Sequence, residues 1–159
     1  MSEALMNNKI QQDNLPPISP AVKQSLLDMV KQNPYMHDMN IEILEMERGY
    51  VKSKMLVTEQ ILNPYGSVHG GCLYSLADIT TGLASSTYNV YSSTIDGRME
   101  YILPAMDTKY VICEGKEIHQ GMHVSQYEAF LYDDKGQLVD KASFSFYMMR
   151  RRIVDSKAE

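Results

Sequence analysis

The sequence predicts one α+β domain in which a curved antiparallel sheet wraps around a long central helix. Three observations lead to this prediction. The chain has 159 residues, which suits a single domain at roughly 150 residues per domain. Residues 72–88 have a helical pattern with a single charged residue, so this helix is expected to be covered on most sides. Strand-like segments lie on both sides of it, and the segments that follow it have no helix between them, which indicates antiparallel pairing.

The N-terminal part combines an arm and a short helix. Residues 1–18 are mostly polar and are expected to form a flexible arm before the domain. Ser19 and Pro20 then have the pattern of a helix start, because a hydroxyl caps free amides and a proline suits the first turn. Apolar residues recur at helical spacing over residues 20–32, which predicts a short amphipathic helix. The following Asn-Pro pair is expected to end it.

Strands are predicted for most of the remaining chain. Residues 41–47 and 50–58, separated by Gly49, are expected to form a hairpin. After the central helix, the candidate strands are 94–103, 109–119, 123–132 and 138–149. The last of them alternates apolar and polar side chains, as does a strand with one buried face. We therefore expect an antiparallel meander, a domain over residues 19–150, and a polar C-terminal tail over residues 151–159.

Composition and charge exclude several classes of function. Fifteen basic and twenty acidic side chains give a net charge of −5, whereas a general nucleic-acid binder needs a large basic surface. There is no run of 18 apolar residues and no basic-then-apolar start, so we expect a cytoplasmic protein without a membrane span. Cys72 and Cys113 lack the spacing of a zinc site and do not make a disulfide scaffold.

Asp78 is the only charged residue of the predicted central helix. Burying a carboxylate without a partner is costly. We therefore expect that Asp78 either has a hydrogen-bonding or charged partner in the fold or borders a cleft. Carboxylates in such settings cluster at functional sites. An exposed structural aspartate at an edge is the alternative that this pattern leaves open.

The loop before the helix ends in Gly70 and Gly71. Glycines at a helix start allow close approach of a ligand to free amides, and the helix dipole adds positive potential. Such a start can hold a phosphate, or polarise a carbonyl as an oxyanion hole does. No lysine follows the glycines in the manner of a P-loop, which weakens the phosphate option. A plain turn is the structural alternative, and His69 is more simply interpreted as shaping this loop than as a base or metal ligand.

Residues 63–84, NPYGSVHGGCLYSLADITTGLA, resemble the signature of the hotdog-fold acyl-CoA thioesterases. The most similar group is the PaaI-type branch of the 4-hydroxybenzoyl-CoA thioesterase-like superfamily. The shared features are an Asn six residues before the His, the His-Gly-Gly itself, and an Asp nine residues after the His. The resemblance covers about residues 20–149 and includes MEYILP at 99–104, which is similar to the family's N-Y-L-x-P strand, with Glu100 in place of its Asn.

The resemblance implies a hotdog fold and hydrolysis of an acyl-CoA thioester to free acid and CoA, without metal or organic cofactor. By the family's pattern, the amide of Gly70 and the side chain of Asn63 would hold the thioester oxygen. Asp78 would activate water as a general base or attack directly, and Thr94 would help to hold the water. In this family the site lies between two subunits, so the resemblance also implies a homodimer or a homotetramer.

Further substrate contacts are expected from four residues. His69 and Gly71 would shape the loop, and Arg150 and Arg151 could bind the phosphates of CoA, because arginine matches phosphate geometry. A solvated basic tail is the alternative for the arginines. The side chains expected to influence pocket depth are Tyr74, Tyr88, Met99 and Met106.

Two other functions suit the predicted fold. One is a non-catalytic hotdog protein that binds acyl-CoA or a fatty acyl group as a sensor, but the complete set of oxyanion donors and acid argues against it. The other is a dehydratase acting on a 3-hydroxyacyl thioester, whose His and acid would be arranged differently. The sequence leaves the acyl group open.

Overall fold

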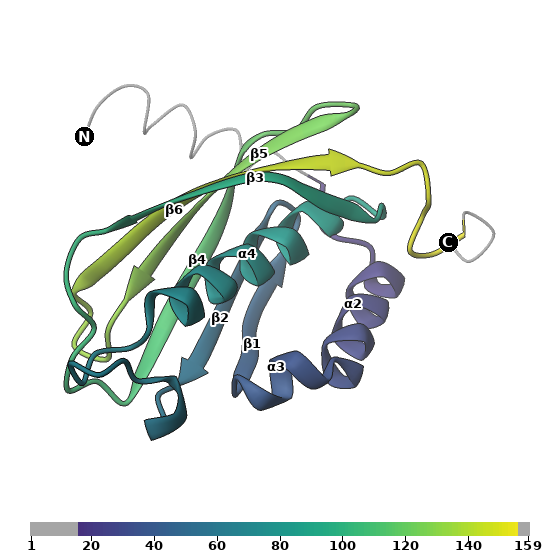
Figure 1. Cartoon of the computed structure of the whole chain (residues 1–159). Helices are drawn as coiled ribbons and strands as arrows, with labels where there is room; N and C mark the ends of the chain where they lie inside the picture. Colours follow the sequence, from purple (N-terminus) through teal and green to yellow (C-terminus); the bar gives the residue numbers. More distant parts are fainter. Residues whose placement is uncertain (1–15, 156–159) are drawn as a thin grey trace.

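A computed structural model describes residues 16–155 and shows a six-stranded antiparallel sheet curved around helix α4 (Gly70–Ser86), as the sequence predicts (Figure 1). The strands are β1 (Ile41–Glu47), β2 (Tyr50–Leu56), β3 (Ser92–Tyr101), β4 (Tyr110–His119), β5 (Val124–Tyr132) and β6 (Leu138–Met148). A short 3-10 helix, η1 (Glu59–Ile61), precedes the loop that leads into α4. The strand order is β1-β2-β4-β5-β6-β3, and all five pairings are antiparallel.

The position of β3 differs from the predicted meander. Strands β4, β5 and β6 follow one another, but β3 pairs with β6 at the far edge of the sheet and not with β4. The reason is that α4 carries the chain across the concave face, and residues 102–109 then return it to β4. Within residues 16–155, β3 has a strand partner on one side only, and most of its residues are exposed.

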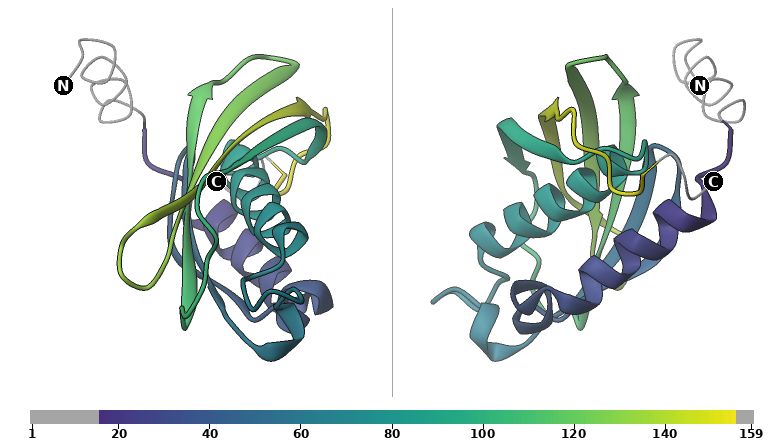
Figure 2. Two further views of the ribbon diagram at one scale, coloured as in Figure 1. Left: turned by 60° about the vertical axis from the view of Figure 1, so that its left-hand side comes forward. Right: turned by 90° about the vertical axis from the view of Figure 1, so that its right-hand side faces the viewer.

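Helix α4 packs closely against the sheet on its apolar face (Figure 2). The fully or almost fully buried apolar residues of α4 are Leu73, Leu76, Ala77 and Ala84. Gly115 of β4 permits the close approach, since a Cβ there would lie 3.2 Å from atoms of Thr80 and Thr81. The buried hydroxyl of Thr80 is satisfied by the carbonyl of Leu76 at 2.6 Å and by Ser53 of β2 at 2.5 Å. These contacts leave the opposite side of α4, which carries Asp78, directed away from the sheet core.

Two N-terminal helices border this opposite side, α2 (Pro20–Gln32) and α3 (Pro34–Asp38). Helix α2 has the predicted bounds, but α3 was not predicted. The side chain of Asn33 caps α3 by accepting hydrogen bonds from the amides of Tyr35 at 3.0 Å and Met36 at 3.4 Å. A helix of five residues is too short to show a helical repeat in its sequence.

The packed part extends a little beyond the predicted domain. Ile18 is buried although it was assigned to the arm, while residues 1–15 of the arm lie outside the described residues. At the other end, Ile153 and Val154 pack partly against the core, and the amide of Val154 donates to the side chain of Asn89 at 2.8 Å. In the described part of the chain, no helix combines the length and the apolar character needed to cross a membrane.

Candidate active site

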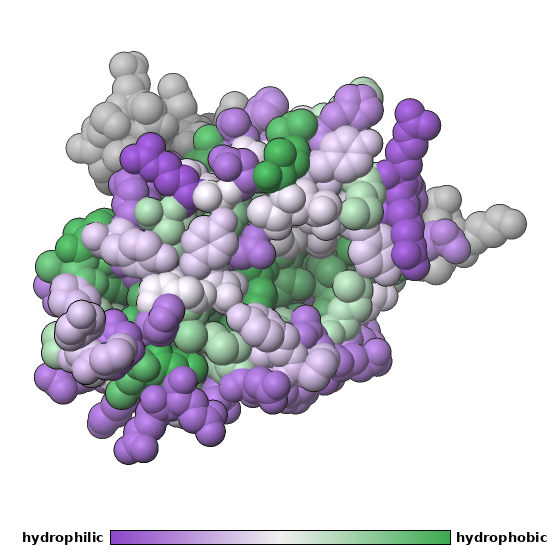
Figure 3. Space-filling view, in the orientation of Figure 1, coloured by the Kyte–Doolittle hydropathy of each residue, from purple (hydrophilic) through white to green (hydrophobic). Residues whose placement is uncertain are grey.

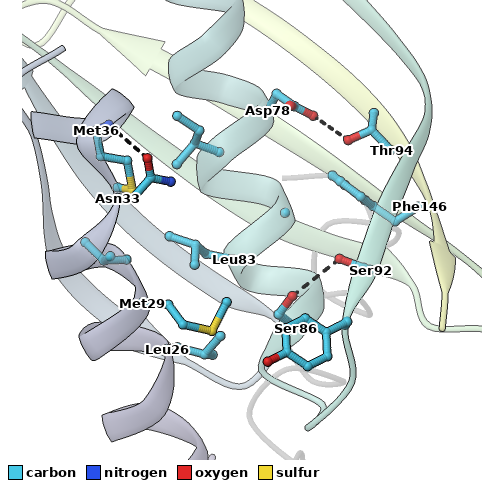
Figure 4. A pocket seen from close by; sticks show the side chains of 14 residues that line it. Leu26, Met29, Asn33, Met36, Asp78, Leu83, Ser86, Ser92, Thr94 and Phe146 are labelled. Carbon is cyan, nitrogen blue, oxygen red and sulfur yellow. Dashed lines mark hydrogen bonds between the residues drawn. The ribbon is translucent and has the colours of Figure 1, made fainter. Parts of the chain in front are cut away.

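Asp78 lies midway along α4 and meets Thr94 of β3 (Figure 4). The hydroxyl of Thr94 donates a hydrogen bond to Oδ1 of Asp78 at 2.8 Å. Burial raises the pKa of the Asp78 carboxyl above its ordinary value, and the hydrogen bond from Thr94 partly lowers it again. A carboxylate that is fixed through one oxygen can use the other to take a proton from water. The structure thus brings together two of the predicted site residues from separate elements.

A cleft of about 290 Å³ opens beside Asp78, between α2 and α4. Its apolar walls are formed by Leu26, Met29, Val30, Met36, Ile79, Leu83 and Phe146. The space-filling view shows this hollow, with hydrophobic residues on its floor (Figure 3). Because α4 rises 1.5 Å per residue, the cleft extends about 12 Å along the helix from Asp78 to Ser86. Its far end is lined by the hydroxyl-bearing residues Ser86, Tyr91 and Ser92.

The start of α4 offers a hydrogen-bond donor. His69 is the N-cap, and its Nδ1 accepts the amide hydrogen of Gly71 at 3.0 Å. The amide of Gly70 has no acceptor among the described residues. The carbonyl of Gly70 accepts the Tyr101 hydroxyl at 3.0 Å, and a Cβ on Gly70 would lie 3.0 Å from the Tyr101 ring. A free amide at the positive end of a helix is suited to stabilise a developing oxyanion.

Asn63 organises the loop before α4. Its Oδ1 accepts the amides of Tyr65 at 2.9 Å and Ser67 at 3.2 Å, and its Nδ2 donates to the Ser67 hydroxyl at 2.7 Å. Gly66, with φ at +83°, makes the turn that these bonds enclose. Because a side-chain amide nitrogen carries two N–H groups, the bond to Ser67 leaves one for a ligand. The role of Asn63 as a second oxyanion donor stays a prediction.

The two halves of the predicted site are far apart within one subunit. Gly70 and Asp78 lie eight residues apart on the same helix, which corresponds to about 12 Å along its axis. A reacting carbonyl must lie about 3 Å from both its oxyanion donor and its nucleophile. A site that uses both groups therefore needs them from different subunits.

Arg150 and Arg151 follow the end of β6. The guanidinium of Arg151 stacks on the ring of Tyr91, 4.7 Å from its centroid. Tyr91 comes after the C-terminal end of α4, whereas Gly70 lies at the start of this helix, about 25 Å away along its axis. Arg151 is therefore remote from the Gly70 loop of its own subunit, and binding of CoA phosphates by Arg150 and Arg151 stays a prediction.

The cleft wall supplied by α2 was not predicted from the sequence. None of the four candidates for pocket depth lines the cleft. Tyr74 packs edge-on against Phe144, with centroids 5.3 Å apart, and Tyr88 donates to Glu117. Met29 lines the cleft. It could have indicated this wall from the sequence, because it widens the apolar side of α2 beyond the face needed for the core. Within residues 16–155 there is no cluster of three or more His, Cys, Asp or Glu that could hold a metal ion.

Known proteins resemble this chain in both sequence and structure. The family model described as "Thioesterase superfamily" matches residues 65–139. The acyl-coenzyme A thioesterase PaaI of Escherichia coli is 26% identical over 101 residues, which cover 64% of this chain and 72% of PaaI. A solved structure of E. coli PaaI superposes with a TM-score of 0.80 at 21% identity and covers 85% of this chain and 98% of PaaI. The chain has a hotdog fold and is similar in sequence to the PaaI-type thioesterases.

Two further relatives extend the comparison. A protein of Archaeoglobus fulgidus that carries only a provisional esterase name is 29% identical over 134 residues, which cover 81% of this chain and 87% of the relative. A Streptococcus mutans protein solved with acetyl-CoA bound shares 25% identity and has a TM-score of 0.68, covering 71% of this chain and 91% of that one. The predicted fold class and the predicted family resemblance are thus confirmed.

Proposed function

We propose that the protein is a homo-oligomeric acyl-CoA thioesterase, which hydrolyses an acyl-CoA to the free acid and CoA. The observation that carries the proposal is the Asp78 carboxyl, held by Thr94 beside an apolar cleft. The chain that carries this arrangement is similar in sequence to the acyl-coenzyme A thioesterase PaaI. The arrangement places a proton acceptor for water beside a space that suits an acyl chain.

The reaction needs an activated water and a polarised carbonyl. Asp78 takes a proton from the water as the water oxygen attacks the thioester carbon, which contributes about 10²–10⁴-fold. The amide of the partner's Gly70, with the partner's Asn63, stabilises the oxyanion, and one such donor contributes about 10²–10³-fold. The tetrahedral intermediate then collapses, the C–S bond breaks, and the thiolate of CoA takes up the proton held by Asp78.

Direct attack by Asp78 is the variant of this mechanism that the geometry also permits. A single turnover in ¹⁸O-labelled water tests for the nucleophilic route, because label in the Asp78 side chain can arise only from hydrolysis of an anhydride at its carbonyl. A general base leaves the Asp78 side chain unlabelled, because the labelled oxygen enters only the acid product. A nucleophile forms an anhydride with the acyl group, whose hydrolysis at the Asp78 carbonyl introduces label into the side chain.

The free edge of β3 supports a dimer that completes the site. Four large apolar residues on β3 and directly after it are exposed, namely Ile95, Tyr101, Ile102 and Leu103. An exposed strand edge with apolar side chains is normally covered by another chain. Antiparallel pairing of two β3 strands about a two-fold axis would set the two α4 helices antiparallel. Each Asp78 would then approach the start of the partner helix.

The decisive experiment compares Asp78→Asn with the wild type across a panel of acyl-CoA substrates, by release of the CoA thiol. We expect kcat to fall about 10²–10⁴-fold, with unchanged circular dichroism and oligomeric state. Asp38→Asn is the matched control, since Asp38 is an exposed carboxylate at the end of α3 that does not line the cleft. Wild-type turnover in a folded Asp78→Asn protein contradicts the proposal. Tight binding of acyl-CoA without thiol release by the wild type would instead support a non-catalytic acyl-CoA sensor.

A further inference from the structure

Gly82 is the position at which α4 leaves the middle of the cleft open. It lies one turn after Asp78, and both residues line the cleft together with Ser86. Residues four apart lie on the same face of a helix, so Gly82 is about 6 Å from Asp78 along the axis. A substrate that enters beside Asp78 must pass Gly82 to reach the far end of the cleft.

The backbone of α4 does not require a glycine at this position. Gly82 has no positive φ, and a Cβ built on it would lie 3.5 Å and 3.9 Å from two atoms of the Phe146 ring, which is ordinary contact. Gly97 lacks such room, because a Cβ there would lie 2.2 Å from the Tyr74 hydroxyl. Glycine inside a helix costs about 1 kcal/mol relative to alanine. What Gly82 provides in return is open space between α4, Phe146 and α2.

The dimensions of the cleft correspond to a medium-length acyl chain. With C–C bonds of about 1.5 Å, an extended chain advances about 1.3 Å per carbon, so 12 Å holds about nine carbons. The first 6 Å, up to Gly82, holds only about four or five carbons.

The lining indicates an uncharged hydrocarbon. Among the described residues, Asp78 is the only charged one that lines the cleft, so the lining itself offers no cation to a second carboxylate on the acyl group. At the far end, the Ser92 hydroxyl is hydrogen-bonded to Ser85 at 2.5 Å and to Ser86 at 3.3 Å. These hydroxyls satisfy one another at this end of the cleft. The pantetheine arm of CoA would leave its amides unpaired along the apolar walls, which is costly.

We propose that the substrate is the CoA thioester of an uncharged, straight medium-chain acyl group of about eight or nine carbons, and that Gly82 determines this length. The proposal rests on the thioesterase function proposed above. A larger side chain at position 82 fills the cleft one turn beyond Asp78. It therefore excludes longer acyl groups and leaves short ones unaffected.

The test measures kcat/KM for straight-chain acyl-CoAs of two to twelve carbons with the wild type, Gly82→Ala and Gly82→Leu. For the wild type we expect a maximum at eight or nine carbons. In Gly82→Leu we expect a loss of about 10–200-fold for eight carbons, the range that a pocket contact gives, and little change for four carbons or fewer. Gly82→Ala adds only the Cβ and improves helix propensity, so it keeps the test valid if the leucine variant does not fold. It should show a smaller loss of kcat/KM for eight carbons and, again, little change for four carbons or fewer.

The outcomes separate this inference from the proposed function. If the wild type is active and the length profile of the folded variants is unchanged, Gly82 does not border the acyl chain and the inference is overturned. An equal loss for all chain lengths also overturns it, because filling the deep part of the cleft must spare short substrates. Inactivity of the wild type with the whole panel overturns the thioesterase function and this inference with it.

Discussion

Replacing Asp140 by asparagine should make the protein more stable at neutral pH. Asp140 lies on β6 with only 1% of its surface exposed, and neither carboxylate oxygen has a hydrogen-bond partner among the described residues. The nearby amide of Ile102 donates its hydrogen bond to the carbonyl of Val139 at 3.0 Å. Burial raises the pKa of Asp140 from 3.8 to about 6, an effect that the Ile102 amide only partly opposes.

The size of the effect follows from the shift in pKa. Between pH 3.8 and 6 the folded protein holds a proton on Asp140 that the unfolded chain has released. The free energy of unfolding therefore falls as the pH rises through this window and stays lower above it. At 1.36 kcal/mol per pKa unit, the loss amounts to about 3 kcal/mol. Asparagine does not ionise, so the Asp140→Asn protein lacks this loss.

Urea unfolding of both proteins, followed by circular dichroism at pH 4 and pH 8 and at one protein concentration, measures the effect. The quantity to compare is the difference in unfolding free energy between variant and wild type. Because the unfolded aspartate is already partly ionised at pH 4, this difference should shift by about 2 kcal/mol in favour of the variant from pH 4 to pH 8. The packing cost of the asparagine cancels, because it is the same at both pH values. A difference that does not change with pH refutes the reasoning, since it means that Asp140 ionises in the folded protein without penalty.

Two more predictions concern the catalytic groups. Thr94→Val removes the hydrogen bond that lowers the pKa of Asp78, so the acid limb of the kcat/KM–pH profile should move to higher pH; a profile that superposes on that of the wild type contradicts the role of Thr94. Gly70→Pro removes the amide donor at a helix position that tolerates proline, so kcat should fall about 10²–10³-fold, whereas Gly70→Ala keeps the donor and should retain most of the activity. Equal losses in both variants would assign the effect to crowding of Tyr101 and not to the missing donor.

Local signals were sufficient for most elements of the fold. The lack of charge over residues 72–88 predicted a covered helix, and the observed α4 (Gly70–Ser86) differs by two residues at each end. Gly49, with φ at +70°, marks the hairpin between β1 and β2 where the sequence places it. The position of β3 was missed because strand pairing after a crossover depends on where the helix crosses the sheet, and no local pattern encodes that.

The candidate site was predicted unevenly for a similar reason. Gly70 and Asp78 could be selected from their positions in the sequence, because a helix start and a lone acid have a recognisable chemistry. The α2 wall of the cleft was not predicted: Met29 indicated a wide apolar side on α2, but the element that this side meets depends on how α2 packs against α4. Asp140 was not predicted either, although it lies on the same alternating face of β6 as Ala142 and Phe144, which are buried.

The central claim is that Asp78 of one subunit acts with Gly70 of the other, and subunit mixing tests it most directly. Asp78→Asn and Gly70→Pro proteins, each nearly inactive alone, are unfolded together at equal amounts and refolded. In a mixed dimer, one site combines both defects and the other contains both wild-type groups. We predict recovery of about a quarter of the wild-type activity, since half of the dimers are mixed and each has one intact site of two. A mixture that forms mixed dimers but stays as inactive as its components contradicts the claim.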